Sequence, residues 1–288
     1  MEERVTFDSH GLKLSGILHI PDDMTPGEKR PACLVLHGFG SNKDSKACIS
    51  PAKLLEKWGY ISLRFDMRGC GESEGPRAHV ICLEQVEDTS SAVTYLMSRP
   101  EVDPSKIACA GHSFGAAVAV YAGGVDKRLA GVISSGGWGD GQTKFELQHP
   151  KPDAWKKFTD TIERGRALRA KTGESIKISR YDIVPIPPAM RGNLAPGSIM
   201  EFPLETVESM LAFRANDVVG EISPRPLLLL HASSDSVTPT EQSIVMFQKA
   251  GRPTDLHLVA DVDHFMFAEN NVMVTDIVRT WLRKYLGY

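Results

Sequence analysis

The chain has 288 residues, with a hydrophobic content of 42% and a charged content of 24%, which is ordinary for a soluble globular protein. Its formal net charge of −3 gives no bulk attraction to nucleic acid or to an anionic membrane, so both are disfavoured as partners. No segment approaches the ~20 apolar residues of a membrane span, and the N-terminal segment lacks the apolar stretch of a signal peptide. We therefore expect a soluble, cytoplasmic protein.

Five cysteines occur in the chain, and no pair has the CxxC spacing of a metal or redox site. Cys33 and Cys109 lie inside apolar segments typical of strands and are expected to be buried. Cys48, Cys70 and Cys82 are expected to be partly exposed, which suits a reducing compartment.

The first half of the chain alternates strand patterns with helix patterns. Residues 5–20 contain two alternating runs around the turn Ser9-His10-Gly11, which predicts a β-hairpin. The apolar run 31–37 does not alternate and is typical of a strand buried on both faces of a parallel sheet. Further strands are predicted at 60–66, 106–110 and 129–134, and helices at 51–57, 83–97 and 114–123. This order predicts a mostly parallel sheet with helices on both faces.

The alternation stops at about residue 139 and resumes after residue 203. Between them an amphipathic helix is predicted at 153–171, no buried strand is visible, and the segment 181–188 is too rich in proline for a central strand. Strands at 226–232 and 255–260 and helices at 241–250 and 272–286 complete the pattern. We therefore predict a core formed by residues 1–138 and 204–288, with residues 139–203 as a cap inserted over the sheet.

The segment Gly111-His112-Ser113-Phe114-Gly115 carries the strongest chemical signal. A predicted strand leads into this G-x-S-x-G pattern, and a helix-forming run follows it. A serine on so tight a turn is strained and needs small neighbours, and the turn places its hydroxyl above the sheet at a helix N-terminus. Ser113 is therefore the candidate nucleophile. The alternative is a glycine-rich loop that contains an incidental serine.

A serine nucleophile needs a base, and the base needs an acid that orients it. Asp235 and His264 each follow a predicted strand, at the end where open α/β sheets build their sites. We predict Asp235 as the acid and His264 as the base. Asp261 and Asp263 are rival acids, but they lie on the loop of the base itself, where the geometry is poorer. A turn or helix cap is the alternative role for Asp235.

Two backbone N–H groups are expected to stabilise the oxyanion of a tetrahedral intermediate. One belongs to Phe114, which directly follows the nucleophile. The other belongs to Phe39 in the loop His37-Gly38-Phe39-Gly40, where the glycines permit close backbone approach. His37 is expected to bond the backbone of this loop rather than to take part in catalysis, because a base is already assigned.

Together these residues resemble the α/β-hydrolase superfamily over nearly the whole chain. The resemblance includes the loop 66–73 (DMRGCGES), where it implies that Asp66 and Arg68 brace the oxyanion loop. The segment 37–44 (HGFGSNKD) and the single cap are similar to feruloyl and cinnamoyl esterases and to dienelactone-hydrolase-like proteins. Those esterases often carry Gln where this chain has Phe114, and dienelactone hydrolases use Cys where it has Ser113. The implied fold is a mostly parallel, twisted sheet with helices on both faces and a mid-chain cap.

The resemblance also implies a carboxylic ester hydrolase that forms an acyl-enzyme and needs neither a metal nor an organic cofactor. Ser113 would attack the acyl carbonyl, His264 would take its proton, and Asp235 would hold the imidazole. An amide, a thioester or a carbon–carbon bond is an alternative target of the same residues. A ligand-binding protein of the same fold is the non-enzymatic alternative. The expected partner is a small-molecule ester or related acyl compound, and a homodimer is left open.

The predicted cap is locally basic, with ten Lys or Arg and six Asp or Glu between Lys144 and Asp182. Such a segment would attract an anionic substrate, but a solvated helix face produces the same pattern and is preferred. An apolar acyl or aryl pocket is predicted from residues that follow the strand at 129–134 or lie in the cap. These are Trp138, Tyr181, Ile183, Val184, Ile186 and Met190. Plain packing of the cap against the core is the alternative.

Overall fold

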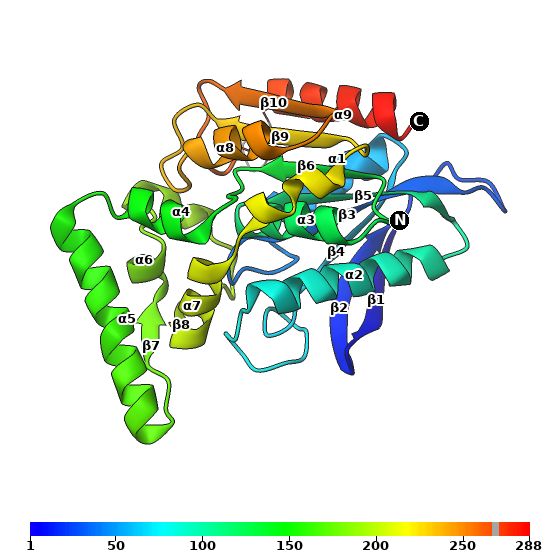
Figure 1. Cartoon of the computed structure of the whole chain (residues 1–288). Helices are drawn as coiled ribbons and strands as arrows, with labels where there is room; N and C mark the ends of the chain where they lie inside the picture. Colours follow the sequence, from blue (N-terminus) through cyan, green and yellow to red (C-terminus); the bar gives the residue numbers. More distant parts are fainter. Residues whose placement is uncertain (267–270) are drawn as a thin grey trace.

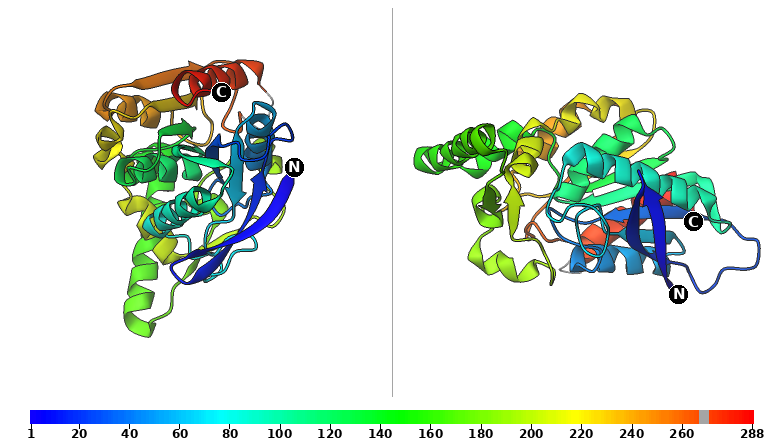
Figure 2. Two further views of the ribbon diagram at one scale, coloured as in Figure 1. Left: turned by 90° about the vertical axis from the view of Figure 1, so that its right-hand side faces the viewer. Right: turned by 90° about the horizontal axis from the view of Figure 1, so that it is seen from below.

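The computed structural model describes residues 1–266 and 271–288, and its described part contains one eight-stranded sheet between two helical layers (Figures 1 and 2). In spatial order the strands are β1 (Glu2–Ser9), β2 (Leu12–His19), β4 (Ile61–Phe65), β3 (Arg30–Leu36), β5 (Val102–His112), β6 (Gly131–Ser135), β9 (Leu227–Ala232) and β10 (Thr254–Val259). β1 and β2 are antiparallel to their neighbours, and the strands from β4 to β10 pair in parallel. The predicted α/β class and mostly parallel sheet are confirmed.

The strand patterns in the sequence follow the burial of the sheet. In the edge strand β1, Val5, Phe7 and Ser9 are buried while the residues between them face solvent. In the central strand β3 every residue is buried, because helices cover both of its faces. Each large apolar side chain buried in this way contributes about 1.5–3 kcal/mol to stability. A strand buried on one face therefore favours apolar residues at alternate positions, and a strand buried on both faces favours them throughout. This difference explains why alternation marks the hairpin and a continuous apolar run marks β3.

The two faces of the sheet are covered by different helices. On one face α1 (Lys46–Lys57) and α9 (Val272–Tyr285) pack their buried residues against β3, β6 and β9. On the other face lie α2 (Cys82–Ser98), α3 (Phe114–Val125) and α8 (Glu241–Lys249). This three-layer arrangement leaves the carboxyl ends of the strands free to carry loops, where sites of open α/β sheets form.

The segment predicted as a cap contains α4 (Gly141–Gln148), α5 (Pro152–Thr172), β7 (Lys177–Ser179), α6 (Arg180–Ile183), the 3-10 turn η1 (Pro188–Asn193) and β8 (Glu201–Pro203). The amphipathic helix is confirmed, since α5 buries Phe158 and Ile162. The expectation of no buried strand is wrong: β7 and β8 pair antiparallel and bury Ile178 and Phe202. Strands of three residues are too short to show a period in the sequence.

After β8 the chain returns to the sheet through α7 (Leu204–Ala212) and the 3-10 turns η2 (Ala215–Asp217) and η3 (Val219–Ile222). α7 contacts both α4 and α5 as well as α2 of the core. In Figure 1 the helix α5 projects away from the sheet, on the side opposite the chain termini. The division into core and cap at residues 138 and 204 stays a prediction. Among the described residues, no helix combines the length and apolarity needed to cross a membrane.

The expected partial exposure of three cysteines is wrong. Cys48, Cys70 and Cys82 are all 0% exposed, and like Cys33 and Cys109 they are free thiols in the protein interior. Cys48 lies on the inward face of α1 and Cys82 begins α2, so each of these two faces the core rather than solvent. Burial raises the pKa of each of these three thiols to about 12, which keeps them protonated and unreactive at neutral pH.

Candidate active site

Ser113 occupies the tight turn between β5 and α3. Its backbone has φ +56° and ψ −117°, a conformation that residues with a side chain rarely adopt and that costs on the order of 1–3 kcal/mol. A Cβ on Gly111 would overlap the Gly115 carbonyl group, and a Cβ on Gly115 would lie 2.5 Å from the His37 carbonyl oxygen. The two glycines of the motif are therefore required by the turn that presents the serine hydroxyl.

Replacing Gly115 by alanine is expected to destabilise the fold by about 3 kcal/mol. The new methyl group would meet the backbone carbonyl oxygens of Leu36 and His37 at 2.7 and 2.5 Å, and no side-chain rotation relieves a clash with backbone. Urea denaturation measures the change in the free energy of unfolding. Gly192→Ala is the matched control, because no atom lies within 4 Å of its added Cβ, and we expect it within about 1 kcal/mol of wild type. Equal stability of the two variants would contradict the close approach of β3 to this turn.

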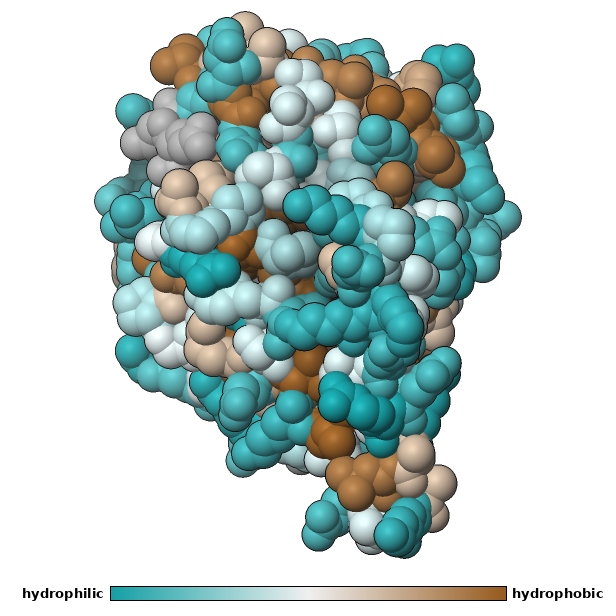
Figure 3. Space-filling view, turned by 90° about the vertical axis from the view of Figure 1, so that its left-hand side faces the viewer, coloured by the Kyte–Doolittle hydropathy of each residue, from teal (hydrophilic) through white to brown (hydrophobic). Residues whose placement is uncertain are grey.

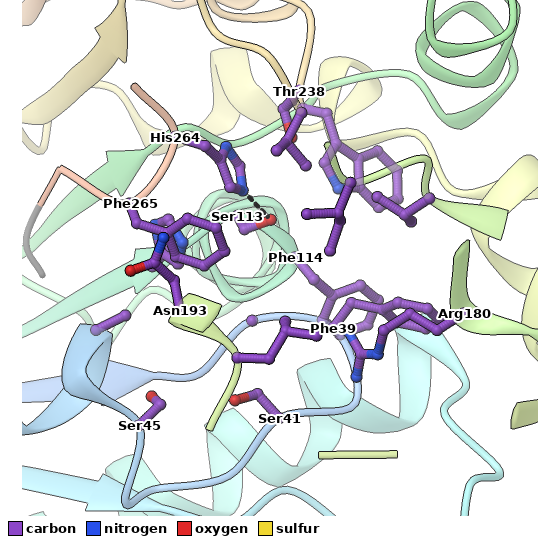
Figure 4. Close-up of a pocket in the computed structure, with 18 of the residues that line it drawn as sticks. Phe39, Ser41, Ser45, Ser113, Phe114, Arg180, Asn193, Thr238, His264 and Phe265 are labelled. Carbon is purple, nitrogen blue, oxygen red and sulfur yellow. Dashed lines mark hydrogen bonds between the residues drawn. The ribbon is translucent and has the colours of Figure 1, made fainter. Parts of the chain in front are cut away.

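Three side chains from the carboxyl ends of β5, β9 and β10 form one hydrogen-bonded row. His264 Nε2 lies 2.9 Å from Ser113 Oγ (Figure 4), and His264 Nδ1 lies 2.8 Å from Asp235 Oδ2. Because the carboxylate accepts a hydrogen bond from the N–H at Nδ1, the proton stays on Nδ1 and Nε2 is left to accept a hydrogen bond from the serine hydroxyl. The structure thus brings together the three residues that the sequence placed at separate strand ends.

The carboxyl group of Asp235 is held on both oxygens. Oδ1 accepts hydrogen bonds from the backbone N–H groups of Val237 and Thr238 at 2.8 and 2.7 Å, and Oδ2 faces His264. Burial alone would raise the pKa of this carboxyl group, but the charge and hydrogen bonds of His264 and His231 hold the pKa well below its usual range. Asp235 is therefore ionised at neutral pH and combines a turn-forming contact with a contact to the histidine ring.

The two rival acids, Asp261 and Asp263, do not bond the His264 ring. Asp263 accepts hydrogen bonds from the backbone N–H and the hydroxyl of Ser236 at 2.8 and 2.7 Å, and from the His264 backbone N–H at 2.7 Å. Its oxygens thus tie the loop after β10 to the loop after β9, and the His264 ring bonds Asp235 instead. Asp261 is an exposed residue with φ +58° at the end of β10.

The loop between β3 and α1 (residues 37–45) passes directly over Ser113. A Cβ on Gly38 would lie 3.7 Å from the Ser113 Cβ. The Phe39 ring stacks on Phe202 of β8 with ring centroids 4.1 Å apart and lies 5.9 Å from the Phe114 ring. Phe114 begins α3, where a backbone N–H has no acceptor within the helix. The N–H groups of Phe39 and Phe114 stay the predicted donors to an oxyanion.

The β3–α1 loop is braced by Asp66, as the resemblance implied. The Asp66 carboxylate accepts hydrogen bonds from the Lys43 backbone N–H and the Lys43 ammonium group at 2.6 and 2.9 Å. The expectation that Arg68 also braces this loop is wrong. Its guanidinium donates to the buried Asp88 of α2 at 2.8 Å and does not face the loop. The cation that pairs with Asp66 is therefore Lys43, which belongs to the loop itself and also pairs with Glu72 at 2.7 Å.

His37 bonds the backbone of the loop, as predicted. Its Nδ1 donates to the Gly38 carbonyl oxygen at 2.8 Å, and its Nε2 accepts from the Met67 N–H at 3.1 Å. Burial lowers the pKa of the ring, which stays neutral and keeps one donor and one acceptor. His112, the residue before the nucleophile, is also buried. Burial lowers its pKa to about 3, and the centroid of its ring lies 4.8 Å from that of His264.

Ser113 opens into a cavity with about 620 Å³ of empty space, part of it continuous with solvent. In Figure 4, Thr238 lies on one side of Ser113 and Ser41 and Ser45 lie on the other, so the cavity extends both ways from the nucleophile. Three of the predicted pocket residues line it, namely Trp138, Val184 and Ile186. They come from the loop after β6 and from the segment that follows α6.

The other three predicted pocket residues lie elsewhere, and their assignment to the pocket is wrong. Tyr181 lines a separate cavity beside α5, and the Arg191 guanidinium stacks 3.8 Å above its ring. Ile183 is completely buried in the hydrophobic core, and Met190 packs against that core while half-buried. Since α6 is a single turn followed by prolines, sequence spacing did not reveal which of its side chains point toward Ser113.

Sequence reasoning missed several residues that line the cavity. They include Lys144, Arg180, Asn193, Leu194, Met210, Thr238 and Phe265. Lys144 and Arg180 belong to the basic segment of the cap, and no spacing distinguishes an inward cation from the solvated ones around it. Within residues 1–266 and 271–288, no cluster of His, Cys, Asp or Glu suitable for a metal ion is found.

The sheet order, the turn at Ser113 and the strand-end positions of its partners are those of an α/β hydrolase. The model of the Hydrolase_4 family, described as serine aminopeptidase S33, matches residues 27–271. The chain therefore belongs to this family of α/β hydrolases, which confirms the resemblance inferred from the motifs.

Two curated relatives of similar length cover most of the chain. The polyketide transferase claH of Penicillium crustosum is 27% identical over 87% of this chain and 91% of its own length. The thiohydrolase aneE of Aspergillus aculeatus is 28% identical over 88% of this chain and 83% of its own length.

Solved structures with low sequence identity share the fold. The α/β hydrolase GrgF from Penicillium sp. sh18 superposes with a TM-score of 0.83 at 24% identity, covering 100% of both chains. Est1E from Butyrivibrio proteoclasticus, solved with ferulic acid bound, superposes with a TM-score of 0.70 at 20% identity, covering 99% of this chain and 100% of its own.

Proposed function

We propose that this hydrolase cleaves acyl esters through a covalent acyl-enzyme, with Ser113 as nucleophile, His264 as base and Asp235 as the acid that orients it. The observation that carries the proposal is the continuous row of hydrogen bonds, 2.9 Å from Ser113 to His264 and 2.8 Å from His264 to Asp235. A nucleophile, base and orienting acid within hydrogen-bond reach are the recognised requirements of this chemistry.

The reaction follows from the positions of these groups. His264 Nε2 takes the hydroxyl proton as Ser113 Oγ attacks the acyl carbonyl carbon, and the ionised Asp235 stabilises the imidazolium that forms. The negative charge on the former carbonyl oxygen is stabilised by the N–H groups of Phe39 and Phe114. The C–O bond then breaks, the leaving alcohol takes the proton from His264, and water attacks the acyl-enzyme by the same route in reverse.

A thioester is the second candidate substrate. Two relatives that match more than four-fifths of the chain are named thiohydrolase and polyketide transferase, and the first of these names supports a thioester as a substrate here. The same residues serve either bond, because ester and thioester present the same carbonyl group to Ser113 and differ in the leaving atom. The preference for an ester or a thioester therefore depends on how the cavity accommodates the leaving group, because the nucleophile is the same for both.

A panel of substrates that share one acyl chain distinguishes these bonds. We expect release of phenol from aryl esters and of thiol from acyl thioesters, and much slower release of amine from the matched amides. The reason is that an amine leaves only after protonation, whereas a phenolate or thiolate leaves readily. The measurement is kcat/KM for the aryl esters, the thioesters and the amides that carry the same acyl chain. Faster turnover of the amides, in line with the aminopeptidase description of the family, would contradict the ester proposal.

A fluorophosphonate probe distinguishes an enzyme from a ligand-binding protein of the same fold. We expect the folded protein to be labelled at Ser113, detected as a mass increase on the peptide that contains this residue. A folded protein that resists the probe would favour the non-enzymatic alternative.

A further inference from the structure

Lys144 is a buried cation without a hydrogen-bond partner. It lies in α4 and is 2% exposed, and within the described residues no acceptor bonds its amine. The rings of Phe145 and Trp138 lie 3.8 and 5.3 Å from the amine nitrogen. Aromatic faces compensate part of the cost of burying a cation, but they leave three N–H donors unsatisfied. Burial therefore lowers the pKa of this lysine to about 7.

This lysine lines the cavity that contains Ser113. It lies beside Trp138, whose ring centroid is 6.4 Å from that of Phe114, the residue next to the nucleophile. Gln148 of the same helix donates a hydrogen bond to the Val237 carbonyl oxygen, which places α4 against the loop after β9. The helix that carries Lys144 therefore borders the loop after β9, whose Thr238 is labelled in Figure 4.

The cavity wall is mixed in polarity. It includes the apolar side chains of Trp138, Met210 and Val237 as well as the hydroxyl groups of Ser41 and Ser45. A hydrocarbon acyl chain is favoured against the apolar side chains of this wall. The buried amine of Lys144 lies among them, beside Trp138.

Lys156 and Lys157 of the cap lie on its surface rather than in this cavity. Lys156 pairs with Asp160 and Lys157 pairs with Asp182, and all four side chains are exposed. In the space-filling view, hydrophilic residues cover most of the cap face, while apolar residues appear in a hollow near its centre (Figure 3). The local basic composition is thus mostly a solvated surface, as preferred from the sequence.

Arg180 is a second cap cation in the cavity wall, and two of its guanidinium nitrogens already donate hydrogen bonds. They donate to the backbone carbonyl oxygens of Ile199 and Gly40 at 2.7 and 3.0 Å. Of these two wall cations, Lys144 is the one whose charged group has no hydrogen-bond partner among the described residues.

We propose that Lys144 determines specificity by binding an anionic oxygen, a carboxylate, at the far end of the acyl group whose carbonyl lies at Ser113. This inference rests on the proposed function, since it assigns the acyl group of that reaction. A carboxylate supplies both the acceptor and the opposite charge that the amine lacks, and their attraction is stronger at an amine as buried as that of Lys144. The preferred substrates are therefore half-esters or half-thioesters of dicarboxylic acids, with a hydrocarbon chain along the apolar side chains of the wall.

Turnover of paired substrates tests this specificity. Each pair has the same aryl ester and the same diacid, from malonyl to suberyl, with the distal carboxylate either free or capped as a methyl ester. We expect wild type to favour the free acid by about tenfold in kcat/KM at one chain length, equivalent to about 1.4 kcal/mol. Lys144→Met and Lys144→Gln should abolish this preference, while Lys156→Met, which removes the same charge from the cap surface, should keep it. A wild type with no preference, or variants that retain it, would overturn the proposal.

Binding of the free diacids gives a readout that needs no turnover. Calorimetry with Ser113→Ala should detect binding of the diacid of matching length and weaker binding of its monomethyl ester, and the added Lys144→Met change should remove the difference. Diacid binding without any turnover would refute the proposed function and support the role of Lys144. Ester turnover without a carboxylate preference or diacid binding would refute the role of Lys144 and leave the proposed function standing.

The pH dependence gives a signature of the same amine. Since its pKa is lowered from 10.5 to about 7, the charged form is populated below about pH 7 and the affinity for the diacid should fall as pH rises above it. The other titratable groups that face this amine or the cavity are Cys82 of α2, Arg180, His112 and His264. The decrease in affinity should therefore be absent from Ser113→Ala/Lys144→Met, where those four groups are unchanged. A decrease that persists in this double variant would assign it to another group and overturn the proposal.

Discussion

Ser113→Ala is expected to reduce kcat by about 10⁶-fold, by comparison with the loss measured when the nucleophile of another serine hydrolase is removed. The serine hydroxyl is the atom held 2.9 Å from His264, and the β3–α1 loop passes over it. Without it no acyl-enzyme forms, and the bound ester meets only water. The residual rate then reflects the oxyanion donors and the cavity alone. Ester turnover and fluorophosphonate labelling measure the change.

The control for this prediction separates chemistry from folding. Alanine also replaces a serine with φ +56°, so urea denaturation must show that the variant is folded. Ser105→Ala, at an exposed position within β5, should retain full labelling and full turnover. Turnover of Ser113→Ala within about tenfold of wild type would show that another group attacks the substrate and would refute the proposed mechanism.

Asp235→Asn is expected to reduce kcat by about 10⁴-fold, the loss seen for the same change in another Ser-His-Asp enzyme. Asp235 accepts a hydrogen bond from the N–H at His264 Nδ1, which fixes the proton there and leaves Nε2 free to act as a base. An asparagine can present its NH₂ group to Nδ1 instead, which favours the wrong tautomer and also removes the charge that stabilises the imidazolium. His264→Ala removes the base itself and should resemble Ser113→Ala.

Asp263→Asn is the matched control, since it makes the same chemical change on the neighbouring loop. Asp263 bonds Ser236 and the His264 backbone N–H rather than the imidazole. We expect its kcat to fall by no more than about tenfold, through a less rigid loop. If Asp263→Asn were the more damaging change, the acid would have to be reassigned to Asp263.

The core of the fold was predictable because its signals are local. The buried run in β3 and the alternation in β1 are direct consequences of how many faces of each strand are covered. The turn at Ser113 was predictable for a similar reason, since the glycines on either side are demanded by contacts within a few residues and with one neighbouring strand. Asp235 and His264 followed from the rule that sites form at the carboxyl ends of parallel strands.

The errors have a shared cause, which is that the direction of a side chain in an irregular segment is set by distant neighbours. Arg68 was assigned to the oxyanion loop, but Asp88 of α2 offered it a buried carboxylate. Cys70 was expected near the surface, yet the packing around its loop covers it completely. Tyr181 and Val184 are three residues apart, and only Val184 lines the cavity of Ser113, since a single helical turn and the prolines after it give no period to follow.

The sequence by itself determined the class of fold, the strained serine turn and the identity of the residues that partner it. Tertiary structure alone decided which cap residues face the nucleophile. It turned Lys144, one of ten basic residues in its segment, into a buried amine beside Trp138 in the wall of the cavity. The physical reason is that strand periodicity and turn sterics are local, whereas burial of a side chain within a cap depends on what the rest of the chain places against it.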